Sequence, residues 1–294
     1  MWHSNSAWYS ISMKCSKAII PMAGYGTRRL PITKALEKEM LPVGNRPVID
    51  YVIEDCIKAG ITEFFLVVGE EFDQVRRYYG QNQILEDYLE NRGKTKELEE
   101  VRALNKRARF HYVVQDQYQP YGTAVPVSLC AHIIPEDEQA LVLMGDDFVF
   151  NEDGSSEVAH LLEAVEAAGA TSGVLAARVT KEEVSKYGVF EMENINGQEF
   201  FKRIVEQPKV EDAPSNLINI SKYLFDHKML EAVKRVTQDP PAANGEYQVI
   251  KALNYYVAEG LQLPVIPING EYLDCGTTEG WLYANQRVIG SKSI

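Results

Sequence analysis

The stretch PMAGYGTRRLPITK, residues 21–34, places two glycines, two threonines and two arginines shortly after an apolar run. Gly24 and Gly26 carry no Cβ, so the backbone N–H groups around them can approach an anion closely. Arg28 follows, and its planar guanidinium suits phosphate oxygens. The loop is not a dinucleotide fingerprint, which needs a third small residue where Arg29 stands, nor a P-loop, which ends in Gly-Lys-Ser/Thr. Taken alone, it indicates either a phosphate-binding loop or a plain tight turn.

The charge pattern around this loop favours phosphate binding. The chain carries a formal net charge of −12, and a field of that sign repels nucleic acid and anionic membranes. Cations nevertheless gather within residues 28–46, namely Arg28, Arg29, Lys34, Lys38 and Arg46. We therefore expect a local site for a small phosphate compound, with no nucleic-acid and no membrane partner.

Carboxylates follow two other apolar runs and could hold a metal ion. Gly145, Asp146 and Asp147 follow ALVLM, and Asp274 follows GEYL. Ligands of open α/β sheets bind at the carboxyl ends of strands, and carboxylate oxygens suit Mg²⁺. Each aspartate could instead cap a helix or close a turn. The five histidines show no metal-ligand spacing, so the candidate Mg²⁺ ligands are Asp146 and Asp274.

The elements that could position these residues follow in the order strand, loop, helix, strand. Residues 17–23 and 61–68 are apolar enough for buried strands, and 47–59 has helical periodicity between Pro47 and Gly60. Such a unit implies a parallel sheet. Further strands are expected at 109–115 and 140–147, and helices at about 123–134 and 156–168.

After residue 170 the pattern changes to strand-like runs in close succession. We expect strands at 171–179, 187–193, 199–208, 216–225 and 263–268, and helices at 226–236, 247–258 and 277–289. The predicted fold class is α/β, a Rossmann-like three-layer sandwich with a mixed central sheet. No Gly/Ser-rich linker interrupts the chain, so one domain is expected over 13–294, with a nucleotide-binding half at about 13–150 and a second half at about 151–294.

The ends and the cysteines bear on the compartment. Four cysteines show neither zinc-site nor disulfide spacing, so a reducing cytoplasm is expected. No apolar run reaches the roughly 18 residues that cross a bilayer. Residues 1–12 lack the features of a signal peptide, and we expect them to be an N-terminal extension or tag.

One segment, residues 81–107, is unusually polar for its place between two strands. Twelve of its 27 residues are charged, and its apolar residues are spaced as in helices. A solvated helical pair at the edge of the domain is expected. A lid or an oligomer contact is the alternative.

Together these motifs resemble the bacterial UTP–glucose-1-phosphate uridylyltransferases, members of the sugar-phosphate nucleotidyltransferase family. The similarity is strongest in KAIIPMAGYGTRRLPITKALEKEMLPVGNRPVIDYVI, residues 17–53, and extends over about 14–290. Shorter similar stretches are QYQPYGTA (117–124), GDD (145–147), YGVFE (187–191), VEQPK (205–209), GEYQ (245–248) and YLDCGTTEG (272–280). The resemblance implies the fold of nucleotide-diphospho-sugar transferases.

The resemblance also implies roles for single residues. Arg28 and Lys38 would act on the phosphates, as catalytic residues. The nucleotide would be bound by Ala23, Gly24, Gly26, Thr27, Gln117 and Gly122. The sugar pocket would contain Gly188 and Glu206, and Asp146 and Asp274 would hold Mg²⁺. The implied substrates are UTP and glucose 1-phosphate, and the implied assembly is a homodimer or homotetramer, with 81–107 and the last helix as candidate contacts.

Two departures from the family pattern stand out. Glu37 occupies a usual proline position, and Gln207 replaces a lysine that would contact the sugar phosphate. Loss of a charge-assisted bond should weaken sugar 1-phosphate binding, and Lys209, two residues further on, could substitute if the loop shifts. Three hypotheses therefore stay open: uridylyl transfer to glucose 1-phosphate, the same chemistry on another base or sugar, and a catalytically weak regulatory paralogue.

Overall fold

The computed structural model describes residues 14–116, 118 and 120–291. The expected N-terminal extension, residues 1–12, and the candidate nucleotide-binding residue Gln117 lie outside these ranges. Within them, no helix combines the length and the apolar character needed to cross a membrane.

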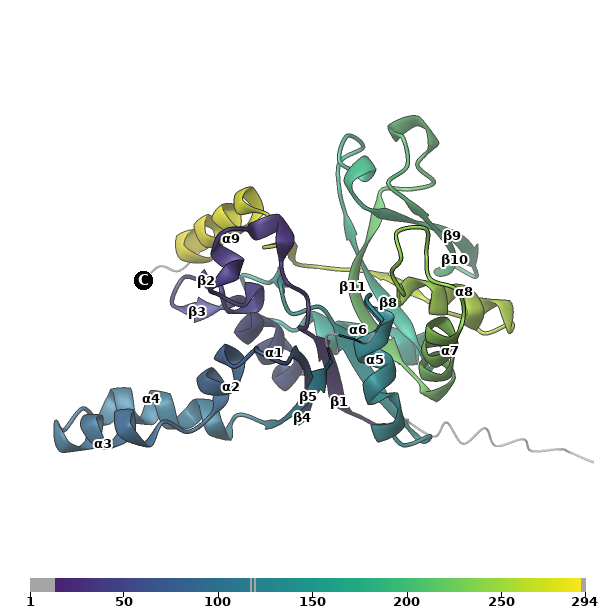
Figure 1. The fold of residues 1–294 in the computed structure, drawn as a ribbon. Coiled ribbons are helices and arrows are strands. Elements are labelled where there is room, and N and C mark those ends of the chain that lie inside the picture. The colour runs from purple at the N-terminus through teal and green to yellow at the C-terminus, as the bar shows by residue number, and fades with distance from the viewer. Residues whose placement is uncertain (1–13, 117, 119, 292–294) are drawn as a thin grey trace, which may run out of the picture.

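Nine strands of the described chain form the central sheet, and the N-terminal half supplies its parallel part (Figure 1). The neighbours in this part are β6 (Glu138–Leu143), β1 (Lys14–Pro21), β4 (Glu63–Gly69) and β5 (Arg109–Gln115). Runs such as Phe64–Val68 are apolar throughout because both faces of this sheet are covered. The predicted parallel sheet is confirmed.

The C-terminal half makes the sheet mixed. Strand β11 (Leu217–Phe225) pairs antiparallel with β6, and beyond it lie β9 (Gly188–Ile195) and β10 (Gln198–Glu206). Strand β8 (Gly173–Arg178) also pairs with β11, and β12 (Val265–Pro267) pairs with β8. The expected mixed central sheet is therefore present.

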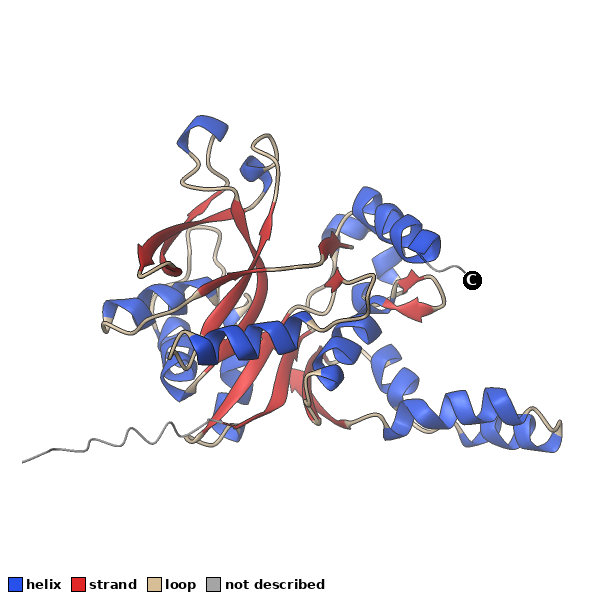
Figure 2. Ribbon diagram, turned by 180° about the vertical axis from the view of Figure 1, so that it is seen from behind, coloured by secondary structure: helices blue, strands red, loops and turns tan. Residues whose placement is uncertain are grey.

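Helices cover both faces of the sheet (Figure 2). Ala18 and Ile20 of β1 belong to a core shared with α1 (Val48–Lys58) and α6 (Glu157–Ala167). The intervening Ile19 belongs to a second core on the opposite face. That second core contains residues of α5 (Ala124–Cys130), α7 (His227–Gln238) and α8 (Ile250–Ala258). Successive side chains of β1 thus pack into two cores, one on each face of the sheet. The helices on both faces complete a three-layer sandwich.

One sequence expectation is wrong: residues 140–147 are not a single strand. Strand β6 ends at Leu143, and the chain turns through Gly145 before β7 (Asp147–Phe150) begins. Strand β7 pairs with β13 (Glu271–Asp274) in a separate two-stranded sheet. A Cβ at Gly145 would lie 3.0 Å from both Glu39 Cγ and Ile49 Cδ1, so the turn fits tightly. The apolar pattern continues across the turn and therefore does not reveal it.

The charged segment 81–107 forms the predicted helical pair. Helices α3 (Gln83–Asn91) and α4 (Thr95–Lys106) extend from the body of the protein beyond α2 (Gln74–Tyr79), as Figures 1 and 2 both show. Large apolar side chains are exposed on this arm and on the last helix, α9 (Thr278–Ser291): Ile84, Leu85, Tyr88, Leu282, Tyr283 and Ile289. The homo-oligomer and its contacts stay a prediction.

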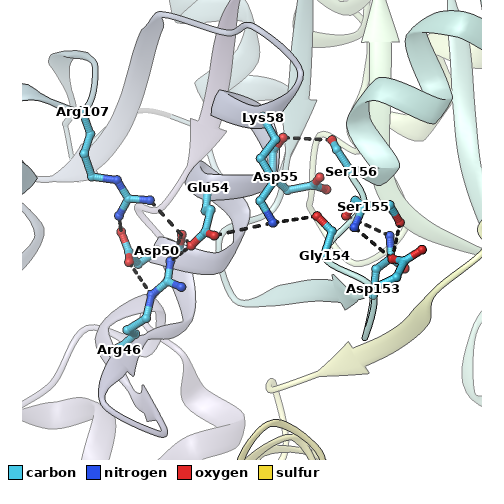
Figure 3. A network of polar contacts seen from close by, with 11 residues as sticks. Arg46, Asp50, Glu54, Asp55, Lys58, Arg107, Asp153, Gly154, Ser155 and Ser156 are labelled. Carbon is cyan, nitrogen blue, oxygen red and sulfur yellow. Dashed lines mark hydrogen bonds and ion pairs between the residues drawn. The ribbon is translucent and has the colours of Figure 1, made fainter. Parts of the chain in front are cut away.

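Asp50 on α1 connects the arm to the body (Figure 3). Its carboxylate, 1% exposed, accepts hydrogen bonds from Arg46 Nε (2.7 Å), Arg107 Nη1 (2.5 Å) and the Tyr79 hydroxyl (2.8 Å). Arg107 caps the C-terminus of α4, and Tyr79 ends α2. The buried Asp50 carboxylate therefore links α1 to β3 (Arg46–Pro47), to the end of α2 and to the end of α4.

We predict that Asp50→Ala destabilises the protein by about 2–4 kcal/mol, because it leaves buried donors without their acceptor. Chemical denaturation measures this loss of unfolding free energy. Asp87→Ala, an exposed change on α3, is the matched control and should stay within about 0.5 kcal/mol of the original. Equal small effects of both changes would contradict the role given to Asp50.

Candidate active site

The glycine-rich loop leaves the sheet at the end of β1 and folds into short 3-10 turns. Gly26 has φ +61° and precedes the first turn, Thr27–Arg29. The Thr33 hydroxyl donates to the Gly26 carbonyl at 2.9 Å, and a Cβ at Gly26 would lie 3.0 Å from Thr33 Cγ2. Only glycine adopts this backbone without strain at so close a contact. The loop is therefore a fixed structure in which Gly26 is required.

A cavity of about 530 Å³ lies beside this loop, at the carboxyl ends of β4 and β5. Its wall includes Ala23 and Thr27, two residues predicted to bind nucleotide. Gln115, the last residue of β5, also lines it, opposite Gly69 in the strand register. The prediction chose Gln117, which lies outside the described residues, and missed Gln115. The signal available in the sequence was its place as the last residue of a predicted strand, because ligands of open α/β sheets bind at the carboxyl ends of strands.

Lys38 and Asp146 meet at the mouth of the loop. Lys38 Nζ lies 2.6 Å from Asp146 Oδ2. Burial alone would raise the pKa of Asp146, but the positive charges of Lys38 and Arg28 hold it below its ordinary value. Burial would likewise lower the pKa of Lys38, and the carboxylates of Asp146 and Glu39 outweigh that effect and raise it. Both groups are therefore charged at neutral pH.

Glu39 lies beneath this pair and has no exposed surface. Its Oε1 is 3.5 Å from Lys38 Nζ, and neither carboxyl oxygen has a hydrogen-bond partner among the described residues. Burial raises the pKa of Glu39 to about 8, because desolvation outweighs the attraction of Lys38. The carboxyl is therefore mostly protonated at neutral pH, and Asp146 is the main charged partner of Lys38.

Arg28 of the glycine-rich loop and Asp274 at the end of β13 approach each other near Gly276. A Cβ at Gly276 would lie 2.8 Å from Arg28 Nη2 and 2.9 Å from Asp274 Oδ1. The Asp274 carboxylate accepts the Gly276 N–H at 2.8 Å. Burial raises the pKa of Tyr187, with Asp274 adding to the rise and Arg28 opposing it, so both charges act on the start of β9. The two halves of the chain thus face each other here.

Only some of the cations that the sequence places around the loop are available to bind a ligand. Arg29 is buried, donates to the Thr277 carbonyl and lies over the Trp281 ring. Arg46 is bound to Asp50. Arg28 is exposed and forms no ion pair with any residue that the structure describes. Arg28 and Lys34, which lines the cavity, are therefore the cations without an ion pair among the described residues, while Lys38 is paired with Asp146.

Asp147, the neighbour of Asp146, has a structural environment. Its carboxylate forms a buried ion pair with Lys222 and accepts a hydrogen bond from the Tyr272 hydroxyl at 3.0 Å. Burial raises the pKa of Asp147 to about 6 despite the attraction of Lys222. Asp147 and Asp274 face each other in the β7–β13 register. Asp146 and Asp274 thus remain the candidate metal ligands.

The donor set fits a metal ion that is shared with a substrate. The described residues contain no group of three or more His, Cys, Asp or Glu side chains able to hold a metal by themselves. Two carboxylates, one with its pKa held low, leave most coordination positions to phosphate oxygens and water. Mg²⁺ prefers this arrangement in phosphoryl-transfer sites.

Gly122 has a structural reason to be glycine. Its φ is +131°, and a Cβ there would lie 2.4 Å from both the backbone N and O of Tyr247. Tyr247 N–H donates to the Tyr121 carbonyl at 2.9 Å, and Ala124 N–H donates to the Tyr247 carbonyl at 2.8 Å. The loop around Gly122 is therefore clasped by a segment of the C-terminal half.

The predicted sugar-phosphate residues lie together at the ends of β9 and β10. Gly188 and Glu206 are register partners, and a Cβ at Gly188 would lie 2.9 Å from Glu206 Oε1. Gln207 has φ +44°, and its N–H donates to the Tyr187 carbonyl at 3.0 Å. Lys209 follows, exposed, as the N-cap residue of the 3-10 turn Val210–Asp212.

Glu37 at the usual proline position has a contact of its own. Its carboxylate accepts the backbone N–H groups of Gln74 (2.6 Å) and Val75 (3.4 Å) at the start of α2. The Gln74 side chain in turn accepts the Glu37 N–H at 3.0 Å. Glu37 thus ties the glycine-rich segment to α2, a role that sequence reasoning missed because the two segments are far apart in the chain.

The raised pKa of Glu39 predicts a pH dependence. The folded state holds a proton up to a pH of about 8, whereas the unfolded chain releases it near 4.5, so Glu39 costs stability as pH rises between these values. Glu39→Gln removes this cost. We expect the variant's unfolding free energy, relative to the original protein, to improve by at least about 1 kcal/mol between about pH 5 and pH 8.

Thermal and denaturant unfolding at the two pH values measure this difference. Glu136→Gln, an exposed change, is the control and should show the same relative stability at both. A Glu39→Gln difference that does not change with pH would mean that Glu39 is ionised in the folded state.

Comparisons with known proteins identify the family of this chain. The sequence model described as nucleotidyl transferase matches residues 17–290. The UTP–glucose-1-phosphate uridylyltransferases of Pseudomonas aeruginosa and Mycoplasma pneumoniae are each 34% identical, over 91% and 92% of this chain and 94% and 91% of theirs. A crystal structure of UDP-glucose pyrophosphorylase complexed with UDP-glucose superposes with a TM-score of 0.80 at 30% identity, covering 95% of this chain and 100% of that one. The chain belongs to the nucleotidyl transferase family.

Proposed function

We propose that this chain transfers the uridylyl group of UTP to glucose 1-phosphate, giving UDP-glucose and pyrophosphate. The observation that carries the proposal is the meeting of Lys38 and Asp146 between the glycine-rich loop and the β6–β7 turn. A cation for phosphate and a carboxylate for a metal ion stand at one point, next to a cavity that can enclose a nucleoside. The similar uridylyltransferases support the choice of substrates.

The nucleotide is assigned to the N-terminal half, about 13–150. The uracil lies in the 530 Å³ cavity, against the backbone of Ala23 and the Gln115 side chain. An amide donates and accepts at once, as a pyrimidine edge requires. The triphosphate runs from there along Gly24 and Gly26 toward Arg28 and Lys38. Gln115 takes the role that the sequence assigned to Gln117.

The proposed cofactor is Mg²⁺, held by Asp146 and Asp274. When bound, it neutralises phosphate charge and orients the triphosphate. The lowered pKa of Asp146 keeps its carboxylate ionised at neutral pH, as a metal ligand requires.

The reaction needs charge compensation more than proton transfer. An anionic oxygen of the sugar 1-phosphate attacks the α-phosphorus of UTP in line, a new P–O bond forms, and the α–β bridge breaks to release pyrophosphate. Lys38 and Arg28 stabilise the charge on the transferring group and the departing pyrophosphate. The raised pKa of Lys38 keeps its ammonium charged throughout. No general base is required.

The sugar is assigned to the C-terminal half, about 151–294. Glu206 accepts hydrogen bonds from sugar hydroxyls above Gly188, where a side chain would collide with it. Gln207 and Lys209 face the sugar phosphate. Gln207 supplies an amide where a charge would bind more tightly. This favours, as the second candidate, the same chemistry on another sugar 1-phosphate or base.

Release of pyrophosphate over a panel of nucleoside triphosphates and sugar 1-phosphates tests the proposal. We expect release with UTP and glucose 1-phosphate, and a smaller preference for UTP over CTP in Gln115→Ala. Turnover with another pair instead would support the second candidate. UTP binding without turnover on any pair would identify a regulatory paralogue and overturn the proposal.

Gln207→Lys tests the sugar-phosphate side. A lysine at this position adds a charge-assisted bond, roughly twice as strong as a neutral one. We expect KM for the sugar 1-phosphate to fall about three- to tenfold, with KM for UTP unchanged. Glu211→Gln, on the neighbouring exposed turn, changes the net charge by the same one unit and is the control. An equal effect of both changes would show that only the general charge matters.

A further inference from the structure

The turn that carries Asp146 is closed by a residue of another strand. Leu143, the last residue of β6, is the register partner of Lys222 on β11. Met144 N–H donates to the Ser221 carbonyl at 3.3 Å. The chain thus remains attached to β11 up to the turn, and β7 begins at Asp147 on its far side.

Lys222 reaches across this turn with its side chain. It is 2% exposed, and its ammonium donates to the Asp147 carboxylate and, at 3.2 Å, to the Asp147 carbonyl. The backbone of Lys222 is therefore paired with Leu143, before the turn, and its side chain binds Asp147, after the turn. Leu224, two residues further along β11, belongs to the core shared with α1, so the Lys222 side chain lies on the α1 face of the sheet.

A distortion of β11 accompanies this contact. The pairing of β11 with β8 shifts register between Asn219 and Tyr223. Ser221 within that interval has φ +52°, a conformation uncommon for residues other than glycine, and its N–H donates to Asn219 Oδ1 at 3.0 Å. Strand bulges of this kind re-aim side chains near functional sites.

Tyr272 completes the arrangement from the opposite side. Its hydroxyl donates to Asp147 Oδ2 at 3.0 Å, while Lys222 holds Oδ1. Tyr272 lies on β13 two residues before Asp274, and Asp274 faces Asp147 in the register. The Asp147 carboxylate therefore joins β11, β7 and β13 directly beside Asp146 and Asp274.

We propose that Lys222 and Tyr272 are positioning residues that act through Asp147 to fix the separation of the two metal-binding carboxylates. The inference rests on the assignment of the metal to Asp146 and Asp274. Lys222 also neutralises Asp147, so Asp147 adds no net negative charge beside Asp146 and Asp274. Removing Lys222 makes the site more negative, which by itself would tighten cation binding. It also releases the carboxylates from their fixed separation, which would weaken cation binding.

Direct metal binding separates these effects. Mn²⁺ is titrated by electron paramagnetic resonance into the protein saturated with a UTP analogue that has a methylene group between the α- and β-phosphorus atoms. We expect the Kd for Mn²⁺ to rise about three- to tenfold in Tyr272→Phe, as loss of one hydrogen bond to a charged group implies. It should rise further in Lys222→Met and recover partly in Lys222→Arg.

A matched control removes a similar hydrogen bond nearby. Tyr283→Phe loses a hydroxyl that donates to Glu271, the first residue of β13, at 2.5 Å. Mn²⁺ binding should not change in this variant, and a thermal melt should show that Tyr272→Phe is fully folded at the temperature of the titration. Tyr272→Phe keeps the aromatic ring and leaves the net charge of the site unchanged. It therefore tests the positioning role even if Lys222→Met fails to fold.

Asp146→Asn distinguishes the two levels of the inference. If it abolishes Mn²⁺ binding while Tyr272→Phe and Lys222→Arg bind as the original protein does, the positioning role is wrong and the metal site stands. If Asp146→Asn also binds Mn²⁺ unchanged, the metal assignment is wrong and the positioning role falls with it. Tighter Mn²⁺ binding in Lys222→Met would show that charge, not position, governs the site.

Discussion

The ion pair between Lys38 and Asp146 is the interaction on which the site depends. It joins the segment after β1 to the turn after β6, and these strands are parallel neighbours in the sheet. Both charges are largely removed from water, which is unfavourable unless each has its partner. The pair therefore requires both segments to be in place, so the cation proposed to bind phosphate and the carboxylate proposed to hold the metal are assembled together.

The rest of the architecture keeps this point fixed and accessible. Glu39 fills the space beneath the pair, and Gly145 allows the turn to pack against it. The C-terminal half contributes β13, with Asp274, and clasps the Gly122 loop through the backbone of Tyr247. The mixed sheet is what permits this, because antiparallel β11 brings the second half alongside β6. A two-substrate site between the halves of one continuous sheet is the result.

Local patterns in the sequence were sufficient for much of the fold. The apolar run before Gly24, the helix after Pro47 and the charged helical pair depend on composition and periodicity, and each is confirmed. The break between β6 and β7 was not predictable, because hydrophobicity continues through the turn and the break depends on pairing with β13, far away in the chain. Strand pairing over such separations leaves no local signal.

The same distinction holds within the site. Asp146 and Asp274 follow apolar runs in the sequence, and the structure places them in the turn after β6 and at the end of β13. Residue types could not separate free cations from bound ones: Arg29 is held by Thr277 and Trp281, which follow it by most of the chain. Gln115 was missed although it ends a predicted strand, because the sequence does not show that the cavity lies beside the ends of β4 and β5.

A double-mutant cycle on Lys38 and Asp146 tests the central claim most directly. It compares kcat/KM in Lys38→Ala, Asp146→Ala and the double variant with that of the original protein. If the two residues act as one unit, the double variant loses little more than the worse single variant, and the coupling energy exceeds about 1 kcal/mol. Losses that simply multiply, with a coupling energy within about 0.5 kcal/mol of zero, would contradict the account.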